Sequence, residues 1–155
     1  MKGKAEVLAL LAELLANELT AINQYLLHAK TCENWGFQRL ASSLLEESAG
    51  EREHANKLID RILFLEGEPN LERYHPLERG TTVREMLDLD VHMEYRAIDA
   101  LNNAIDACRA HGDGATEFLL RSILDAEQED TNWLEAQLEL MRQVGEQNYL
   151  AQQLT

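Results

Sequence analysis

Proline and cysteine are scarce in this chain of 155 residues, and each scarcity limits what the chain can form. The only prolines, Pro69 and Pro76, lie in one short region, so long uninterrupted helices are permitted on either side. The only cysteines, Cys32 and Cys108, stand in no metal-binding spacing, which excludes a cysteine-based zinc or iron–sulfur motif. Two isolated thiols are typical of a reducing compartment, and we therefore expect a cytoplasmic protein.

Basic residues are few as well, with 14 lysines and arginines against 28 aspartates and glutamates and a formal net charge of −14. This balance argues against nucleic acids and anionic membranes as partners. It fits either a solvated acidic surface or a sink for cations, and charge alone does not separate the two. Long uncharged apolar runs are missing, so we expect no membrane span, and residues 1–4 do not begin a signal peptide.

Helical periodicity is the main signal that the chain does contain. Apolar residues recur at spacings of three and four, and 45% of the residues are hydrophobic, which predicts one all-α domain over residues 1–155. Glycines mark the expected helix ends, and Thr82-x-x-Glu85 has the pattern of a capping box that begins the third helix. The helices are expected at about residues 5–34, 38–65, 82–110, 115–144 and 147–153.

The only long loop, at about residues 66–81, determines the expected topology. A helix of about 28 residues is about 42 Å long, and a loop of about 15 residues can span about 50 Å. The loop can therefore run the length of the molecule, while short corners make the first two and the last two long helices antiparallel pairs. The predicted fold is a four-helix bundle with one long crossover loop and a short C-terminal fifth helix.

Four glutamates, Glu18, Glu51, Glu94 and Glu127, lie where the helical pattern places apolar side chains. Burying an unpaired carboxylate costs several kcal/mol, and four together would repel each other unless a cation holds them ionised. The same interval of 33 residues separates Glu18 from Glu51 (51 − 18) and Glu94 from Glu127 (127 − 94), which indicates two matched helical hairpins. The pattern predicts a metal site inside the bundle.

The residue types around these acids indicate which metal centre is expected. Glu51-x-x-His54 places a carboxylate and an imidazole one helical turn apart. Single glutamates from two helices, with Glu-x-x-His pairs from the other two, are typical of di-iron bundles, although the fourth helix here carries Asp in place of the second His. The predicted metal ligands are Glu18, Glu51, His54, Glu94, Glu127 and Asp130.

Five strings spread along the chain are distinctive enough to compare with known families. They are Met1–Gly3, Asn17–Tyr25, Arg61–Gly67, Trp133–Glu135 and Asn148–Leu150. Together they resemble the bacterioferritin family of the ferritin-like proteins, and the likeness covers essentially the whole chain. The resemblance implies iron storage and detoxification by a cage of 24 subunits, each a ferroxidase that oxidises Fe(II) with O₂ or peroxide for mineral storage.

The resemblance also implies a role for each ligand. By position, Glu18 and Glu94 would be terminal ligands, and Glu51 and Glu127 would bridge two irons. His54 would be the nitrogen ligand of one iron. These five residues would therefore form the catalytic centre, together with Tyr25.

Two positions leave alternatives open. Tyr25, two helical turns after Glu18, resembles the family's tyrosine beside the centre, a candidate electron donor, and a core tyrosine fits its position equally well. Asp130 stands where the family has a second histidine; its oxygen could take a similar place, or the side chain could point away and leave one iron poorly bound. If Asp130 ligates, we expect iron oxidation to continue with two irons of unequal affinity.

Arg52 is a second departure, because it stands at the family's axial haem-ligand position, where a methionine is expected. A guanidinium has no lone pair to give iron, so a homo-oligomer of this chain should lack properly ligated haem. The chain thus resembles the haem-free subunit type, and a mixed cage with a haem-binding bacterioferritin subunit is an expected partner arrangement. His28 is expected to be a hydrogen-bonded structural histidine rather than a ligand.

Two other functions compete with this prediction. One is a small di-iron oxidase or peroxidase of the rubrerythrin type, although such proteins usually add a cysteine-rich iron domain that is missing here. The other is a structural or accessory cage subunit whose centre is impaired by Asp130. Iron oxidation by the purified chain alone separates the accessory subunit from the ferroxidase.

Overall fold

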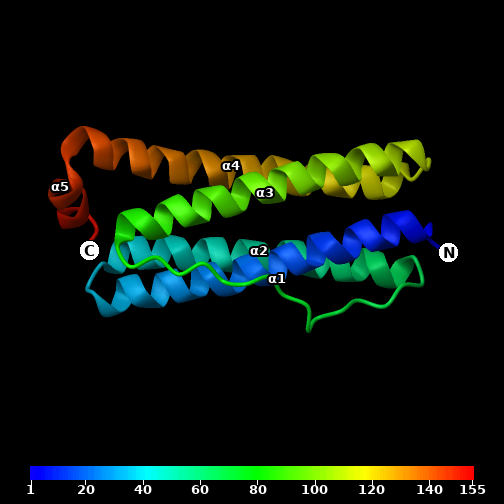
Figure 1. The fold of residues 1–155 in the computed structure, drawn as a ribbon, viewed down its shortest axis with the longest axis horizontal. Coiled ribbons are helices and arrows are strands. Elements are labelled where there is room, and N and C mark those ends of the chain that lie inside the picture. Colours follow the sequence, from blue (N-terminus) through cyan, green and yellow to red (C-terminus); the bar gives the residue numbers. More distant parts are fainter.

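A computed structural model describes residues 1–155 as an all-helical bundle of four long helices and one short one (Figure 1). The long helices lie within two residues of their predicted bounds. The short helix ends at Ala151, two residues before the predicted end, because the amide of Gln153 bonds the carbonyl of Leu150 in a tighter turn. The five helices are α1 (Ala5–Asn34), α2 (Gln38–Phe64), α3 (Val83–Ala110), α4 (Gly114–Val144) and α5 (Glu146–Ala151).

The crossover loop, residues 65–82, confirms the predicted topology. It leaves the end of α2 and runs along the outside of α1 to the far end of the bundle, where α3 begins (Figure 1). The pairs α1/α2 and α3/α4 are antiparallel hairpins, and α1 packs against α3 across the bundle. No helix is long and apolar enough to cross a membrane.

The start of α3 is capped in a way that the sequence predicted only in part. Thr82 Oγ1 accepts a hydrogen bond from the amide of Glu85 at 3.1 Å, as the capping box requires. The reciprocal bond is displaced by one residue, because the Glu85 carboxylate accepts from the amide and the hydroxyl of Thr81, each at 2.6 Å. The crossover loop is therefore fastened at its end by two successive threonines.

Buried apolar side chains form two clusters rather than one continuous core. One cluster contains Leu11 and Leu58, and the other contains Leu44 and Leu87, with the side chain of Tyr149 from α5 closing its outer end. The glutamates predicted to bind metal belong to neither cluster and occupy the levels of the helices between them. A polar layer therefore divides the core across all four long helices.

Candidate metal centre

Each long helix contributes one buried glutamate to this polar layer. Glu18 comes from α1, Glu51 from α2, Glu94 from α3 and Glu127 from α4, and none is more than 4% exposed. The equal spacing of the two glutamate pairs along the chain thus brings all four residues to one level. No lysine or arginine lies within ion-pair distance of these carboxylates.

His54 is the one basic group inside the layer. Its Nδ1 atom lies 3.1 Å from Glu127 Oε1, 3.3 Å from Glu51 Oε2 and 3.7 Å from Glu18 Oε2. These four residues each offer a ligand atom, and all four atoms lie within 4.8 Å of one another. The Glu-x-x-His spacing on α2 produces this arrangement because residues three apart share one helix face.

Two atoms of this cluster have no partner in the protein. Glu51 Oε1 and Glu127 Oε2 are buried and make no hydrogen bond. Buried carboxylate oxygens without a partner carry a large desolvation cost, and a bound cation removes it. Carboxylate oxygens with an imidazole nitrogen are also the donors found in di-iron bundles, so the residues present fit iron.

The ionisation of the cluster is strongly perturbed. Burial, helped by the charges of neighbouring carboxylates, raises the pKa values of Glu51 and Glu94 well above the usual range, and burial does the same to Glu18. Burial is also the largest influence on Glu127, but the hydrogen bonds with His54 and Glu94 and the charge of His54 together outweigh it and lower the pKa. For His54, burial is overcome by Glu127 and Glu51, which raise its pKa to about 10. Protons thus neutralise the cluster when no metal does.

Tyr25 and Glu94 join α1 to α3 beside this cluster. The Tyr25 hydroxyl is fully buried and donates a hydrogen bond to Glu94 Oε1. Burial and the neighbouring carboxylate of Glu94 raise the pKa of Tyr25 well above its usual value, so the side chain stays a protonated phenol. Tyr25 therefore lies beside the carboxylate cluster, hydrogen-bonded to one of its glutamates.

Asp130 is not among the four residues that converge. It is half-buried on α4, one turn after Glu127, and both Glu127 and Glu47 on α2 lie close enough to shift its pKa. Burial and the contact with Asp130 raise the pKa of Glu47 to about 8, and burial raises that of Asp130 to about 6. The protonation of Glu47 and that of Asp130 are therefore linked beside the cluster.

Arg52 lies on the surface of the bundle, whereas the methionines of the helices lie inside it. Arg52 is exposed on α2, facing away from the carboxylates next to it in the chain. Met86, Met93 and Met141 are buried in the apolar core. None of these methionines is therefore free on the surface to replace the one missing at position 52.

A cavity of about 560 Å³ connects the cluster with the outer surface. Its inner end is lined by Glu18 and Glu94, which are buried. Its outer end is lined by Glu13 on α1 and by His75 and Glu78 of the crossover loop, all of which are partly exposed. The carboxylate cluster is thus reached from a mouth bordered by paired acidic and basic side chains.

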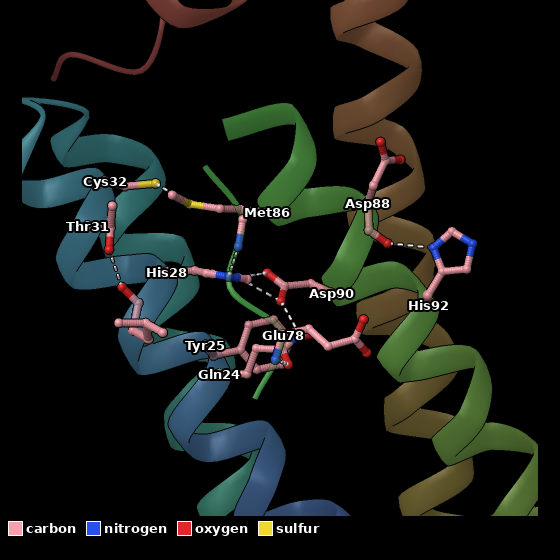
Figure 2. Close-up of polar contacts among 12 residues, drawn as sticks. Gln24, Tyr25, His28, Thr31, Cys32, Glu78, Met86, Asp88, Asp90 and His92 are labelled. Atoms are coloured by element: carbon pink, nitrogen blue, oxygen red, sulfur yellow. Dashed lines mark hydrogen bonds and ion pairs between the residues drawn. The ribbon is translucent and has the colours of Figure 1, made fainter. Parts of the chain in front are cut away.

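Sequence reasoning missed a second buried polar group next to the cluster, which is shown in Figure 2. Asp90 is completely buried on α3 and lies 2.9 Å from both His28 Nδ1 and Gln24 Nε2. The signal was present, because Asp90 precedes Glu94 by one helical turn on an apolar helix face. The prediction that His28 is hydrogen-bonded and structural is confirmed.

Comparisons with known proteins agree with this geometry. The family model of the ferritin-like domain matches residues 8–144. A bacterioferritin of Mycolicibacterium paratuberculosis is 46% identical over 152 residues, covering 98% of this chain and 96% of the relative, and one of Mycobacterium tuberculosis is 45% identical with the same coverage. A bacterial ferritin of Synechocystis is 42% identical over the full length of both chains. The chain belongs to the bacterioferritin family.

Proposed function

We propose that this chain is the ferroxidase of an iron-storage cage, oxidising Fe(II) to Fe(III) at the carboxylate cluster. Iron storage follows from membership of the bacterioferritin family. The observation that carries the ferroxidase proposal is the pair of buried carboxylate oxygens, Glu51 Oε1 and Glu127 Oε2, that have no hydrogen-bond partner in the protein and that a bound cation would satisfy. Assembly of 24 copies and a cytoplasmic location are part of the proposal.

The cluster would hold two Fe(II) ions as substrate. Each Fe(II) loses one electron, and the two electrons with two protons reduce O₂ to hydrogen peroxide, or hydrogen peroxide to two waters. The chain's own contribution is a preorganised set of negative ligands, which stabilises Fe(III) relative to Fe(II). We assign Glu18 and Glu94 as terminal ligands, Glu51 and Glu127 as bridging ligands, and His54 as the nitrogen ligand.

Proton release accompanies ion binding at this cluster. Because burial raises the pKa values of Glu18, Glu51 and Glu94, their carboxyl groups hold protons until a cation displaces them. We further propose that Tyr25 can take the place of one Fe(II) as an electron donor to the oxidant. Its phenolic proton then passes to Glu94 Oε1, the atom to which it is already hydrogen-bonded, and the tyrosyl radical that remains is reduced by a further Fe(II). The burial of Tyr25 keeps this electron source away from solvent.

We propose that Asp130 is an oxygen ligand of the second iron, which makes the two iron sites unequal. The proximity of Asp130 to Glu127 and His54 supports this, because both charges shift its pKa. Glu47 competes for Asp130 in the metal-free protein, so this ligand must be drawn from its pair before it binds. The second iron should therefore bind more weakly than the first.

Haem is not part of the proposed homo-oligomer. The exposed Arg52 has no lone pair for iron, so the residues present do not fit an axial haem ligand at this position. A haem-bearing cage would need a second type of subunit with a methionine there. We propose such a hetero-oligomer as an alternative assembly for this chain.

The second candidate function is an accessory subunit with an impaired centre. The pairing of Asp130 with Glu47, outside the group of four converging ligands, is the observation that favours it. A subunit of this kind would bind iron at one site and depend on a competent partner for rapid oxidation.

One experiment separates these functions. Purified, metal-free protein is mixed with Fe(II) in air, and the ferric absorbance and the haem Soret band are recorded together. The ferroxidase proposal expects rapid oxidation without a Soret band, loss of that rate in Glu127→Gln, and no change in Glu129→Gln, an exposed position on the same helix. Slow oxidation by the unaltered chain, restored by a co-expressed relative, would establish the accessory role instead.

A further inference from the structure

The crossover loop is tied to α1 by a regular series of hydrogen bonds that the proposed function does not use. Thr20 Oγ1 accepts from the amide of His75 at 2.9 Å, and Gln24 Oε1 accepts from the amide of Glu78 at 3.2 Å. His28 Nε2 accepts from the amide of Gly80 at 3.2 Å. Thr20, Gln24 and His28 are spaced by four residues and therefore share one face of the helix. We call these three residues the α1 ladder.

The ladder supplies acceptors that the loop cannot provide for itself. Residues 75–80 contain Pro76, form no strand, and run beside a helix whose own backbone groups are already paired. An amide that is buried against such a helix needs a side-chain acceptor. Three amides of the segment find one in successive turns of α1.

Each rung is oriented by a second hydrogen bond. Thr20 donates its hydroxyl proton to the carbonyl of Ala16 at 2.7 Å, which turns an oxygen lone pair toward the loop. Gln24 donates from Nε2 to Asp90 Oδ1 at 2.9 Å, which leaves its Oε1 atom for the loop amide. The direction of each side chain is thus fixed before the loop binds to it.

His28 is held by the same carboxylate, as Figure 2 shows. Its Nδ1 atom lies 2.9 and 3.0 Å from the two oxygens of Asp90, so Nδ1 carries the proton and donates it. Nε2 is then the free acceptor that the amide of Gly80 requires. Asp90 therefore orients two of the three rungs, Gln24 and His28. It does so from α3, the helix that packs against α1 across the bundle.

The loop end is pressed closely against the first turn of α3. A Cβ atom at Gly80 would lie 2.5 Å from Met86 N and 2.7 Å from Met86 Cα, so only glycine fits there. This close packing and the ladder together fix the position of residues 75–80 on the surface of α1.

This same segment forms the outer wall of the cavity that leads to the metal cluster. His75, Pro76 and Glu78 line the cavity, and so do the first two rungs, Thr20 and Gln24. The wall is completed at its rim by ion pairs of His75 with Glu13, at 2.9 Å, and of Glu78 with Arg96. The side chains of these rim pairs are partly exposed, whereas Thr20, Gln24 and His28 are buried, so the ladder makes the larger contribution to holding the wall.

We propose that Thr20, Gln24 and His28 are positioning residues that hold the crossover loop closed over the cavity and thereby set the rate at which divalent cations pass between the outer surface and the carboxylate cluster. None of the three ligates the metal. The inference rests on the proposed function only for the identity of the cation as Fe(II); the passage itself concerns any divalent ion that the cluster binds.

Amide hydrogen exchange tests whether the ladder holds the loop. In Thr20→Val the His75 amide loses its acceptor, and we expect exchange in the segment 75–80 to become about tenfold faster, the effect of losing one buried hydrogen bond. Thr31→Val is the matched control, because the Thr31 hydroxyl also bonds its own helix, at Leu27, but makes no hydrogen bond to the loop. Thr20→Ser keeps the hydroxyl and should restore slow exchange.

Stopped-flow binding of Co(II), observed by its ligand-field absorption, tests whether the loop controls passage. Passage through a loop that is only transiently open scales with the open fraction. We therefore expect the association and dissociation rate constants of Thr20→Val to rise together by the same factor as the exchange rate, while the Kd stays unchanged. His28→Leu, which alters no residue lining the cavity, should give the same pattern, with circular dichroism used to confirm its fold.

Every other outcome overturns the proposal. Unchanged exchange would mean that the ladder does not hold the loop. Faster exchange with unchanged Co(II) rates would place the route of entry elsewhere, and an altered Kd would mean that the substitution distorts the metal cluster itself. If the unaltered protein binds Co(II) but does not oxidise Fe(II), the proposed ferroxidase function fails while the ladder is still tested by these rates.

Discussion

At the level of single residues, the buried carboxylates have opposite effects on the protein with and without metal. Glu51 has one oxygen without any partner, and burial raises its pKa well above the usual range. The only cation in reach within the protein is His54, which cannot neutralise several carboxylates at once. The metal-free cluster is therefore maintained at a cost in stability that ion binding removes.

The stability of the metal-free protein should fall as pH rises above about 4.5, the ordinary value for a glutamate. Because the pKa of Glu51 is higher in the folded state than in the unfolded state, the folded state binds more protons than the unfolded state at pH values between the two pKa values. Glu51→Gln removes this proton and should lessen the slope by up to about 1.4 kcal/mol per pH unit. Urea unfolding in chelator at several pH values measures it, and the exposed Glu53→Gln should leave the slope unchanged.

Asp130 determines whether the two iron sites are equal. Asp130→His restores a Glu-x-x-His pair on α4 and removes the acidic partner of Glu47. We expect an anaerobic Fe(II) titration to change from two steps of different affinity to a single step, because a neutral imidazole is no longer competed for by Glu47. Equal filling of both sites by the unaltered chain would contradict the proposed role of Asp130.

At the level of the helices and loops, two glycines illustrate how tertiary contacts set the effect of one substitution. Gly80 lies against the backbone of Met86, whereas nothing lies within 4 Å of a Cβ atom built at Gly50 inside α2. The crossover loop thus depends on close approach to α3, while α2 tolerates a side chain at its glycine. The stability of a helix end can depend on another helix in the same way, because Asp113 at the start of α4 pairs with Arg61 of α2.

Alanine at these two glycines should have opposite effects. Gly80→Ala places a methyl group in contact with fixed backbone and should destabilise the protein by about 1–3 kcal/mol, the usual cost of overpacking. Gly50→Ala should stabilise it by up to about 1 kcal/mol, because alanine is the better helix former. Denaturant midpoints of the two variants measure this, and a neutral Gly80→Ala would show that the loop moves away freely.

The N-terminus of α4 is capped by Asp113, the residue that precedes the helix, and Asp113 is in turn paired with Arg61 of α2. Asp113 accepts from the amide of Thr116 at 3.0 Å and pairs with Arg61 at 3.0 Å. Asp113→Ala should cost about 1–2 kcal/mol of unfolding free energy, as loss of a cap does, and Asp113→Asn should keep most of the cap and lose the ion pair. Asp125→Ala, an exposed position within the same helix, is the control in the same unfolding assay.

At the level of the whole molecule, the bundle has a polar layer inside and the exposed Arg52 outside, where we propose that a haem ligand is missing. Arg52 is exposed on the outer side of α2, and the cluster lies on the inner side of the same helix. Two adjacent residues of α2, Glu51 and Arg52, thus face the interior of the bundle and its outer surface, respectively. Replacing Arg52 should therefore change whether the protein binds haem, without changing the proposed iron centre.

Arg52→Met should allow a homo-oligomer to bind haem between two subunits, since a thioether sulfur can donate to iron and a guanidinium cannot. We expect a Soret band in Arg52→Met produced with haem supplied, none in Arg52→Gln, and the same Fe(II) oxidation rate in both. Light scattering checks the size of the particle, proposed as 24 subunits of 17.6 kDa. A Soret band of equal strength in the unaltered protein would contradict the assignment of Arg52.

Much of the candidate site was predictable because helical periodicity makes a buried acid conspicuous. Glu18 and Glu94 stand out within apolar helix faces, and the interval of 33 residues within each hairpin places their partners at the same level. The neighbourhood of Asp130 was not predictable, because Glu47 lies on another helix and only packing brings the two together. The ladder was hidden for the same reason, since each rung bonds a loop residue more than 50 positions away.

The sequence by itself determined the helices, the crossover topology and the identity of the buried acids, because each of these depends on local spacing along the chain. Only the tertiary structure decided which carboxylate oxygens lack a partner, how Asp90 orients Gln24 and His28, and where the crossover loop lies over the cavity. Hydrogen bonds between distant segments depend on side-chain directions that are fixed by packing. The periodicity of the sequence does not indicate these directions.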